Sequence, residues 1–145
     1  MSTSGQDPFT GTWVFSGARS ALSTPMPQSW ALQIRASESD VSHREEIITS
    51  DGSEMTVVLH ATFDGEDYAV SGSPLMDTMA CTRLAPHVIG GTGKKAGAVT
   101  LTDTLTASPD GEVLTLTYSI FDGNREIATG TGIFERRRAE SQSHQ

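Results

Sequence analysis

The chain of 145 residues has a formal net charge of −8 at pH 7 and a hydrophobic fraction of 36%. This length suits a single domain with one core, and the negative charge disfavours nucleic acid and anionic membranes as partners. Cys81 is the only cysteine, which rules out an intrachain disulfide and fits a reducing compartment. Because no apolar run is long enough for a signal peptide or a membrane span, the sequence predicts a soluble, cytoplasmic protein.

The first predicted strand covers residues 9–15 and contains Gly11-Thr12-Trp13. A Gly-x-Trp on an opening strand resembles the start of lipocalin-like barrels, and this resemblance implies that the glycine lets the chain pass closely and that the indole plugs one end of a barrel. A sheet closes only when its last strand returns to the first, since an open sheet leaves an unpaired edge. The run 128–136 offers that partner. We expect the cluster Arg136-Arg137-Arg138 to be a solvated terminus.

Between these ends the sequence predicts antiparallel strands without long helices. Four Asp-Gly dipeptides, which favour tight hairpin turns, lie between segments in which apolar and polar residues alternate. The further strands are expected at residues 30–35, 39–49, 54–63, 67–72, 76–84, 86–90, 97–107, 112–121 and 126–136. Residues 17–29 are expected to form a crossing loop with one helical turn at 18–22, and residues 90–95 a hairpin turn. The predicted fold is an all-β, up-and-down antiparallel barrel of about 8–10 strands over residues 9–137. A sandwich is the alternative, and residues 1–8 and 138–145 are expected to be disordered.

Several turn and plug motifs resemble those of small bacterial lipocalin-like proteins of the calycin type. They are Gly11-Thr12-Trp13, the run 63–74 followed by Asp77-Thr78, Ser108-Pro109-Asp110-Gly111 and Phe134-Glu135-Arg136. The resemblance covers nearly all of residues 9–137 and implies a barrel with a cavity, but no particular reaction. Fatty-acid-binding relatives end in an Arg-x-Tyr pair that grips a carboxylate. Because Gly132 and Phe134 stand at those positions here, a free fatty acid is not expected to bind in that way.

Asp103 occupies an apolar position in the alternation of its strand, Val99-Thr100-Leu101-Thr102-Asp103-Thr104-Leu105. A two-residue turn at Asp110-Gly111 places Asp103 opposite Tyr118 and aligns the leucines of both strands on one face. A carboxylate and a phenol inside a dry cavity could exchange protons with a substrate. The alternative is that Asp103 lies near the barrel mouth or pairs with an arginine such as Arg83.

The same reasoning at Asp51-Gly52 places His43 opposite His60, with Glu45 on the same face. Two imidazoles and a carboxylate could form a metal site or an acid–base pair. However, the other face of this hairpin carries Met55, Val57 and Leu59 and is the better core face. We therefore expect both histidines to point to solvent, and we predict no metal site.

The last hairpin has two possible registers. A two-residue turn at Asp122-Gly123 puts Tyr118 on the face of Ile127, Thr129 and Ile133. A three-residue turn that includes Asn124 puts it on the face of Ala128, Gly130, Gly132 and Phe134. The resemblance favours the second, which leaves space at the two glycines opposite Leu114 and Leu116.

Two functions are compatible with these patterns, and neither needs a cofactor, because the sequence contains no cofactor motif. The first is binding of a mostly apolar small molecule inside the barrel. The predicted ligand contacts are Trp30, Leu59, Tyr68, Met79, Leu101, Leu116 and Phe134. The alternative is a cofactor-free cyclase or isomerase that folds a flexible, polyketide-like substrate, with Asp103 and Tyr118 in proton transfer or orientation.

Overall fold

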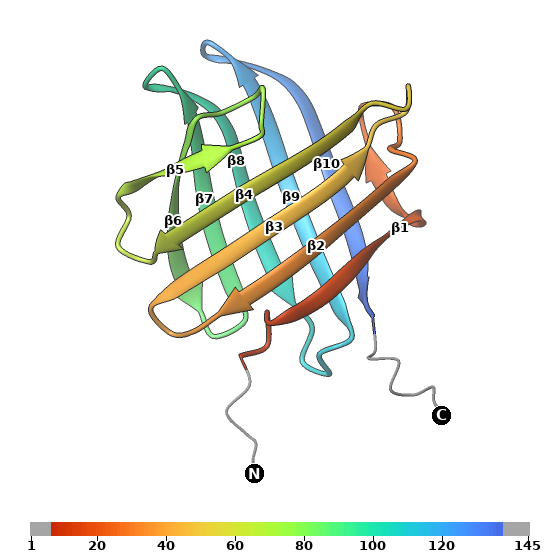
Figure 1. The fold of residues 1–145 in the computed structure, drawn as a ribbon, viewed down its shortest axis with the longest axis vertical. Helices are drawn as coiled ribbons and strands as arrows, with labels where there is room; N and C mark the ends of the chain where they lie inside the picture. The colour runs from red at the N-terminus through yellow and green to blue at the C-terminus, as the bar shows by residue number, and fades with distance from the viewer. Residues whose placement is uncertain (1–6, 138–145) are drawn as a thin grey trace.

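The computed structural model describes residues 7–137, and these form ten antiparallel strands around one core (Figure 1). The strands are β1 (Gly11–Leu22), β2 (Ser29–Ala36), β3 (Asp40–Ile48), β4 (Glu54–Thr62), β5 (Asp67–Ser71), β6 (Thr78–Ala85), β7 (Val88–Lys95), β8 (Ala98–Ala107), β9 (Val113–Asp122) and β10 (Arg125–Arg136). Each strand pairs with its sequence neighbour, and β10 returns to β1. The predicted up-and-down barrel is therefore confirmed and the sandwich is excluded.

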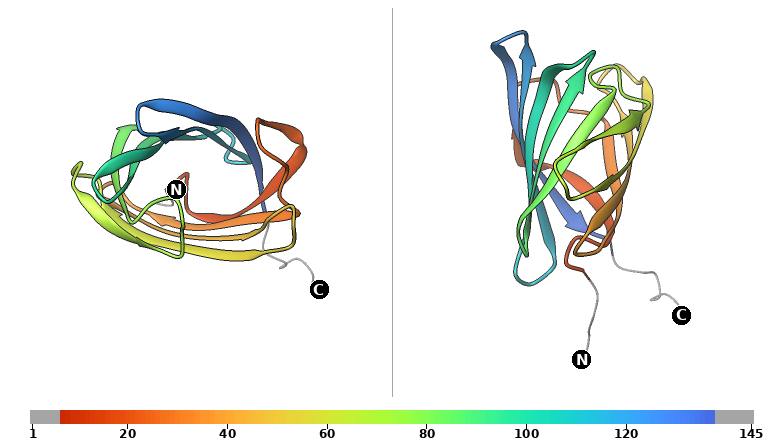
Figure 2. Two further views of the ribbon diagram at one scale, coloured as in Figure 1. Left: turned by 90° about the horizontal axis from the view of Figure 1, so that it is seen from above. Right: turned by 90° about the vertical axis from the view of Figure 1, so that its left-hand side faces the viewer.

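Viewed from above, the barrel is a closed and flattened ring, so two broad walls face each other across a short axis (Figure 2). In the ring of ten strands, β3 and β8 lie five places apart and so occupy opposite walls. No helix in the described part of the chain is long and apolar enough to cross a membrane.

The first strand is longer than predicted, because the chain stays extended through residues 17–22. β1 pairs with β2 only over Gly11–Val14, and its second half pairs with β10 after an irregularity between Ser16 and Ala21. Ser20 bridges that irregularity: its hydroxyl donates to the Ser16 carbonyl (2.6 Å) and accepts from the Ile133 amide (2.8 Å). The predicted helical turn at 18–22 is wrong, since these side-chain hydrogen bonds satisfy the strand where its pairing breaks.

The indole of Trp13 plugs one end of the barrel, as the opening motif predicts. Trp13 is fully buried, and its Nε1 donates to the Phe9 carbonyl at 3.0 Å. The guanidinium of Arg136 lies 4.3 Å from the indole centroid. It also donates to the backbone carbonyls of Thr10, Pro8 and Gly111. Arg136 is therefore part of the closed end and not the solvated residue that we expected.

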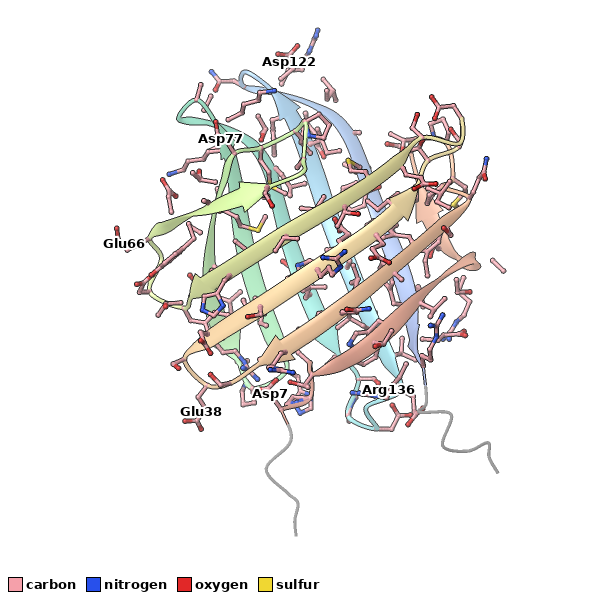
Figure 3. The ribbon with its side chains drawn as sticks, in the orientation of Figure 1. Asp7, Glu38, Glu66, Asp77, Asp122 and Arg136 are labelled. Atoms are coloured by element: carbon pink, nitrogen blue, oxygen red, sulfur yellow. The ribbon has the colours of Figure 1, made fainter. Side chains whose placement is uncertain are left out.

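Asp7 also belongs to this closed end, where its carboxylate pairs with Arg83 at 2.9 Å. Figure 3 shows Asp7 and Arg136 at one end of the barrel, while Asp77 and Asp122 lie at the other, open end. Residues 7 and 8 of the predicted lead-in are thus in contact with the barrel. Residues 1–6 and the predicted tail at 138–145 lie outside the described residues.

The register between β8 and β9 is as predicted. Asp103 lies opposite Tyr118, with Leu101 opposite Ile120 and Leu105 opposite Leu116. The apolar–polar pattern of the two strands and the length of the turn between them predict the same register. The register in turn determines the face of the sheet on which each side chain lies.

The sequence prediction of the register between β3 and β4 is wrong by one residue. His43 lies opposite Leu59, and it is Ser42 that lies opposite His60. The Asp51-Gly52 dipeptide sits in a five-residue connection from Thr49 to Ser53, closed by the Thr49 amide donating to the Ser53 carbonyl (2.8 Å). One additional residue in the turn moves each β3 side chain to the other face, so His43 points inward.

Two further turns also differ from the prediction. Residues 90–95 belong to β7, and the β7–β8 turn falls at Ala96-Gly97. In the last hairpin, Arg125 lies directly opposite Asp122, and a bulge at Ile127 then shifts the register. Tyr118 faces Gly130 as a result, so it takes the face that the resemblance favoured through a bulge rather than a longer turn.

Candidate functional site

The barrel contains a cavity of about 260 Å³, lined by residues from β2 to β9. Its walls are mostly apolar, and they include five of the seven predicted ligand contacts: Trp30, Leu59, Met79, Leu101 and Leu116. The sulfur side chains of Met76, Met79 and Cys81 form part of one wall. A mostly apolar cavity with a few polar groups inside a barrel is a common setting for a small-molecule site.

Two predicted ligand contacts lie elsewhere. The half-buried Tyr68 does not line the cavity, and its hydroxyl donates to the Asp64 carboxylate at 2.6 Å on the surface. Phe134 is inward and fully buried, but it packs into an aromatic cluster with Phe15 and Trp30, at centroid distances of 5.5 and 5.0 Å. This cluster fills the space beside Gly132 that we expected a ligand to occupy.

A continuous row of paired residues crosses five strands on the wall that carries Asp103. From β6 to β10 the row is Cys81, Gly91, Asp103, Tyr118 and Gly130. The glycines make room for the larger neighbours, because a Cβ on Gly91 would lie 2.6 Å from the Asp103 Oδ1 and one on Gly130 would contact the Tyr118 ring. The row therefore directs a carboxyl and a phenol toward the cavity, which both residues line.

Within the described part of the chain, no arginine or lysine lines the cavity beside the carboxyl of Asp103. Arg83, the alternative partner, is held at the closed end by Asp7. Tyr118 lies beside Asp103, but no hydrogen bond joins them. Desolvation first, and then the negative charge of Glu45, raise the pKa of Asp103 to about 7. Burial also raises the pKa of the Tyr118 phenol.

His43 and Glu45 line the same cavity from β3, on the opposite wall. His43 lies between Ile34 and Leu59 in the sheet. Burial lowers the pKa of its imidazole to about 4, and its Nε2 is buried without a hydrogen-bond partner among the described residues. The prediction that both histidines face solvent is thus right for His60, which is exposed, and wrong for His43.

Glu45 lies between Leu32 and Val57 in the sheet. Burial raises the pKa of its carboxyl to about 7, although the nearby indole N–H of Trp30 by itself lowers that pKa. The contact with Trp30 falls short of a well-formed hydrogen bond, since the indole Nε1 has no partner of good geometry. Both carboxyls therefore lie in an environment that favours their neutral form.

Sequence reasoning missed His43 and Glu45 as cavity residues because of the one-residue error in register. The signal that could have found them is the alternation of β3 itself. Residues 41, 43, 45 and 47 share one face, and the apolar members Val41 and Ile47 mark that face as inward.

The cavity thus combines an apolar wall with an acidic interior that carries no compensating cation. Among residues 7–137, no lysine or arginine lines it. No group of three or more metal-ligating side chains is placed to hold a metal ion within the described range. The arrangement can bind an apolar molecule, and its desolvated carboxyls can accept or donate a proton near neutral pH.

The sequence matches no protein-family model and no curated protein. At a coarse level, the closed up-and-down barrel of ten antiparallel strands is consistent with the lipocalin-like architecture that the sequence motifs suggested.

Proposed function

We propose that the protein binds a mostly apolar small molecule inside its barrel. The observation that carries this proposal is the cavity of about 260 Å³, enclosed by apolar side chains from both walls. An apolar cavity holds water poorly, because water there finds few hydrogen-bonding partners, and it is therefore disposed to accept an apolar ligand.

Side chains shared between the cavity and its surroundings support the proposal. The loop between β5 and β6 contributes Pro74, Leu75 and Met76 to the cavity wall. Trp30, Ile47 and Met55 line the cavity and also a second depression beside β1–β4. A ligand would enter past these side chains.

Titration with a neutral, environment-sensitive probe such as N-phenylnaphthylamine tests the proposal. The variant Leu116→Trp fills the cavity, while Thr117→Trp adds the same side chain to the outer face of the same strand. We expect the first to weaken probe binding by about tenfold or more and the second to leave it unchanged. Circular dichroism checks that both variants fold, and Leu101→Phe with Thr102→Phe is the second matched pair. Equal probe binding by cavity and outer-face variants would overturn the proposal.

A second candidate function is a cofactor-free cyclase or isomerase acting on a flexible apolar substrate. The observation that favours it is Asp103, a desolvated carboxyl of raised pKa beside Tyr118 in the cavity wall. Such a carboxyl could act as general base, and the cavity could supply orientation. Polyketide-like substrates provide the test, with Asp103→Asn and Tyr118→Phe compared with the unmodified protein. Turnover that survives both substitutions would rule out proton transfer by this pair.

A further inference from the structure

We propose that the ligand is an apolar amine whose ammonium group sits between the carboxyl groups of Glu45 and Asp103. This inference rests on the proposed binding function and specifies the chemistry of the ligand's polar end. Its basis is the position of two carboxyls on opposite walls of one cavity, together with an unpartnered imidazole nitrogen in the same cavity.

The two carboxyls face a common space. Glu45 is on β3 and Asp103 on β8, which are diametrically opposed in the ring of ten strands, and both line the cavity. The charge of Glu45 contributes to the raised pKa of Asp103, as expected for two carboxyls that line one cavity. A single cation between them would interact with both.

Among residues 7–137, the protein provides no cation at this place. Arg83 is paired with Asp7, Arg136 lies on Trp13, and Lys94 is paired with Asp67 at 3.2 Å. The remaining described pairs, Arg19–Glu135 and Arg44–Glu46, are exposed. A buried charge is costly unless it is paired, so a cationic ligand would supply what the cavity lacks.

An unpartnered nitrogen provides a second, independent indication of a polar ligand group. His43 Nε2 is buried in a side chain that lines the cavity, and it has no hydrogen-bond partner among the described residues. The Trp30 indole N–H is a donor and lies near the Glu45 carboxyl. Buried polar atoms are rarely left unpaired without a reason. The neutral imidazole can accept from an ammonium N–H, and the electron-rich faces of Trp30 and Tyr118 suit a cation.

Among the described residues, no titratable group on the surrounding strands would prevent an ammonium from binding between the two carboxyls. The titratable groups facing the two carboxyls are His43 on β3, Cys81 on β6 and Tyr118 on β9. The thiol and the phenol both have raised pKa values, so they remain neutral near pH 7, and the imidazole is neutral because its pKa is lowered. An anionic ligand would instead bring a third negative charge to the two carboxyls.

Binding of an ammonium should be linked to proton release. The cation favours the ionised carboxyls, so the complex holds fewer protons than the free protein and amine. Affinity for an amine should therefore rise between pH 5.5 and pH 8.5, where the carboxyls ionise. Affinity for a neutral alcohol should not rise over the same interval.

Displacement of the neutral probe by octylamine, octanol and octanoate tests the inference, because each has eight carbons and they differ mainly at the head group. At pH 8.5 we expect octylamine to bind about tenfold more tightly than octanol, since charge-assisted hydrogen bonds are roughly twice as strong as neutral ones. Octanoate should bind most weakly. In Glu45→Gln and Asp103→Asn, the preference for the amine should fall toward unity, while octanol binding is retained. Glu38→Gln, at an exposed position, is the matched control.

The outcomes separate the two proposals. If the probe does not enter the cavity, the binding function fails, and the amine inference fails with it. If the probe binds but octylamine binds no more tightly than octanol, or octanoate binds most tightly, only the amine inference is overturned. An amine preference that persists unchanged in both carboxamide variants would also overturn it. Calorimetry in buffers of different ionisation enthalpy should show proton release with octylamine and none with octanol.

Discussion

Replacing both cavity carboxyls by carboxamides should reverse the dependence of stability on pH. The double variant Glu45→Gln/Asp103→Asn removes two titrating groups and keeps their size. In the folded protein both carboxyls have a pKa of about 7, against ordinary values of 4.5 and 3.8. At pH values between the ordinary pKa and the folded-state pKa, the folded state binds more protons than the unfolded state. The free energy of unfolding therefore falls as pH rises.

The size of the effect follows from these values. From pH 5.5 to pH 8.5 the two carboxyls together should lower the free energy of unfolding by about 4 kcal/mol. His43 acts in the opposite direction, because its folded pKa of about 4 lies below the ordinary 6.5, so its contribution to stability is lost as pH falls. That contribution is about 1 kcal/mol over the same interval, which leaves a net fall of about 3 kcal/mol. In the double variant only His43 remains, and stability should rise by about 1 kcal/mol.

Urea unfolding followed by circular dichroism at pH 5.5, 7 and 8.5 measures these changes, and the lowest pH stays above the sequence pI of about 4.8. The control Glu38→Gln/Asp122→Asn removes two exposed carboxyls, and it should behave as the unmodified protein does. If the unmodified protein were equally stable at all three pH values, or if the double variant kept the same slope, the carboxyls would not be desolvated and the reasoning would fail.

Three further predictions concern single side chains. Asp103→Leu should raise the thermal midpoint at pH 8.5 by a few degrees, at roughly 2–4 °C per kcal/mol for a chain of this length, because it removes a desolvated carboxylate that has no cationic partner among the described residues; calorimetry showing a lower midpoint would contradict this. Trp13→Ala should lower the free energy of unfolding by about 3–5 kcal/mol in urea, since the indole is fully buried in the closed end, and a loss below about 1 kcal/mol would show that the plug is dispensable. Burial raises the pKa of the Cys81 thiol to about 12, so a thiol reagent at pH 8 should label it slowly in the folded protein and rapidly in urea; rapid labelling without urea would mean that the site is open.

The fold could be predicted from the sequence because its signals are local and redundant. Alternation marks the strands, Asp-Gly marks several turns, and the return of the last strand to Trp13 marks closure. The Asp103–Tyr118 pairing was predictable for the same reason, since the strand pattern and the turn at Asp110-Gly111 indicate one register.

The other half of the site could not be predicted in the same way, because it depends on the length of one turn. Asp51 suggests a tight turn, but its side chain accepts from the Thr49 hydroxyl and the Ser53 amide and so stabilises a longer connection. A difference of one residue there decides whether His43 and Glu45 face water or the cavity. The bulge at Ile127 is similar, since no residue pattern in β10 announces it.

The guanidinium of Arg136 joins the first and last strands across 128 residues of sequence, from Arg136 to Pro8. The pairing of β1 with β10 joins the strands with the largest separation in sequence. The conformational entropy lost in closing so large a loop opposes folding until the barrel has no open edge. Until then β1 presents an unpaired edge to other chains, so folding should be slow and sensitive to protein concentration. Both ends of the described chain lie at the same end of the barrel (Figure 1). A circular permutant that connects them and opens the chain at Asp122-Gly123 would turn the seam between β1 and β10 into a local hairpin and transfer the long-range closure to β9 and β10.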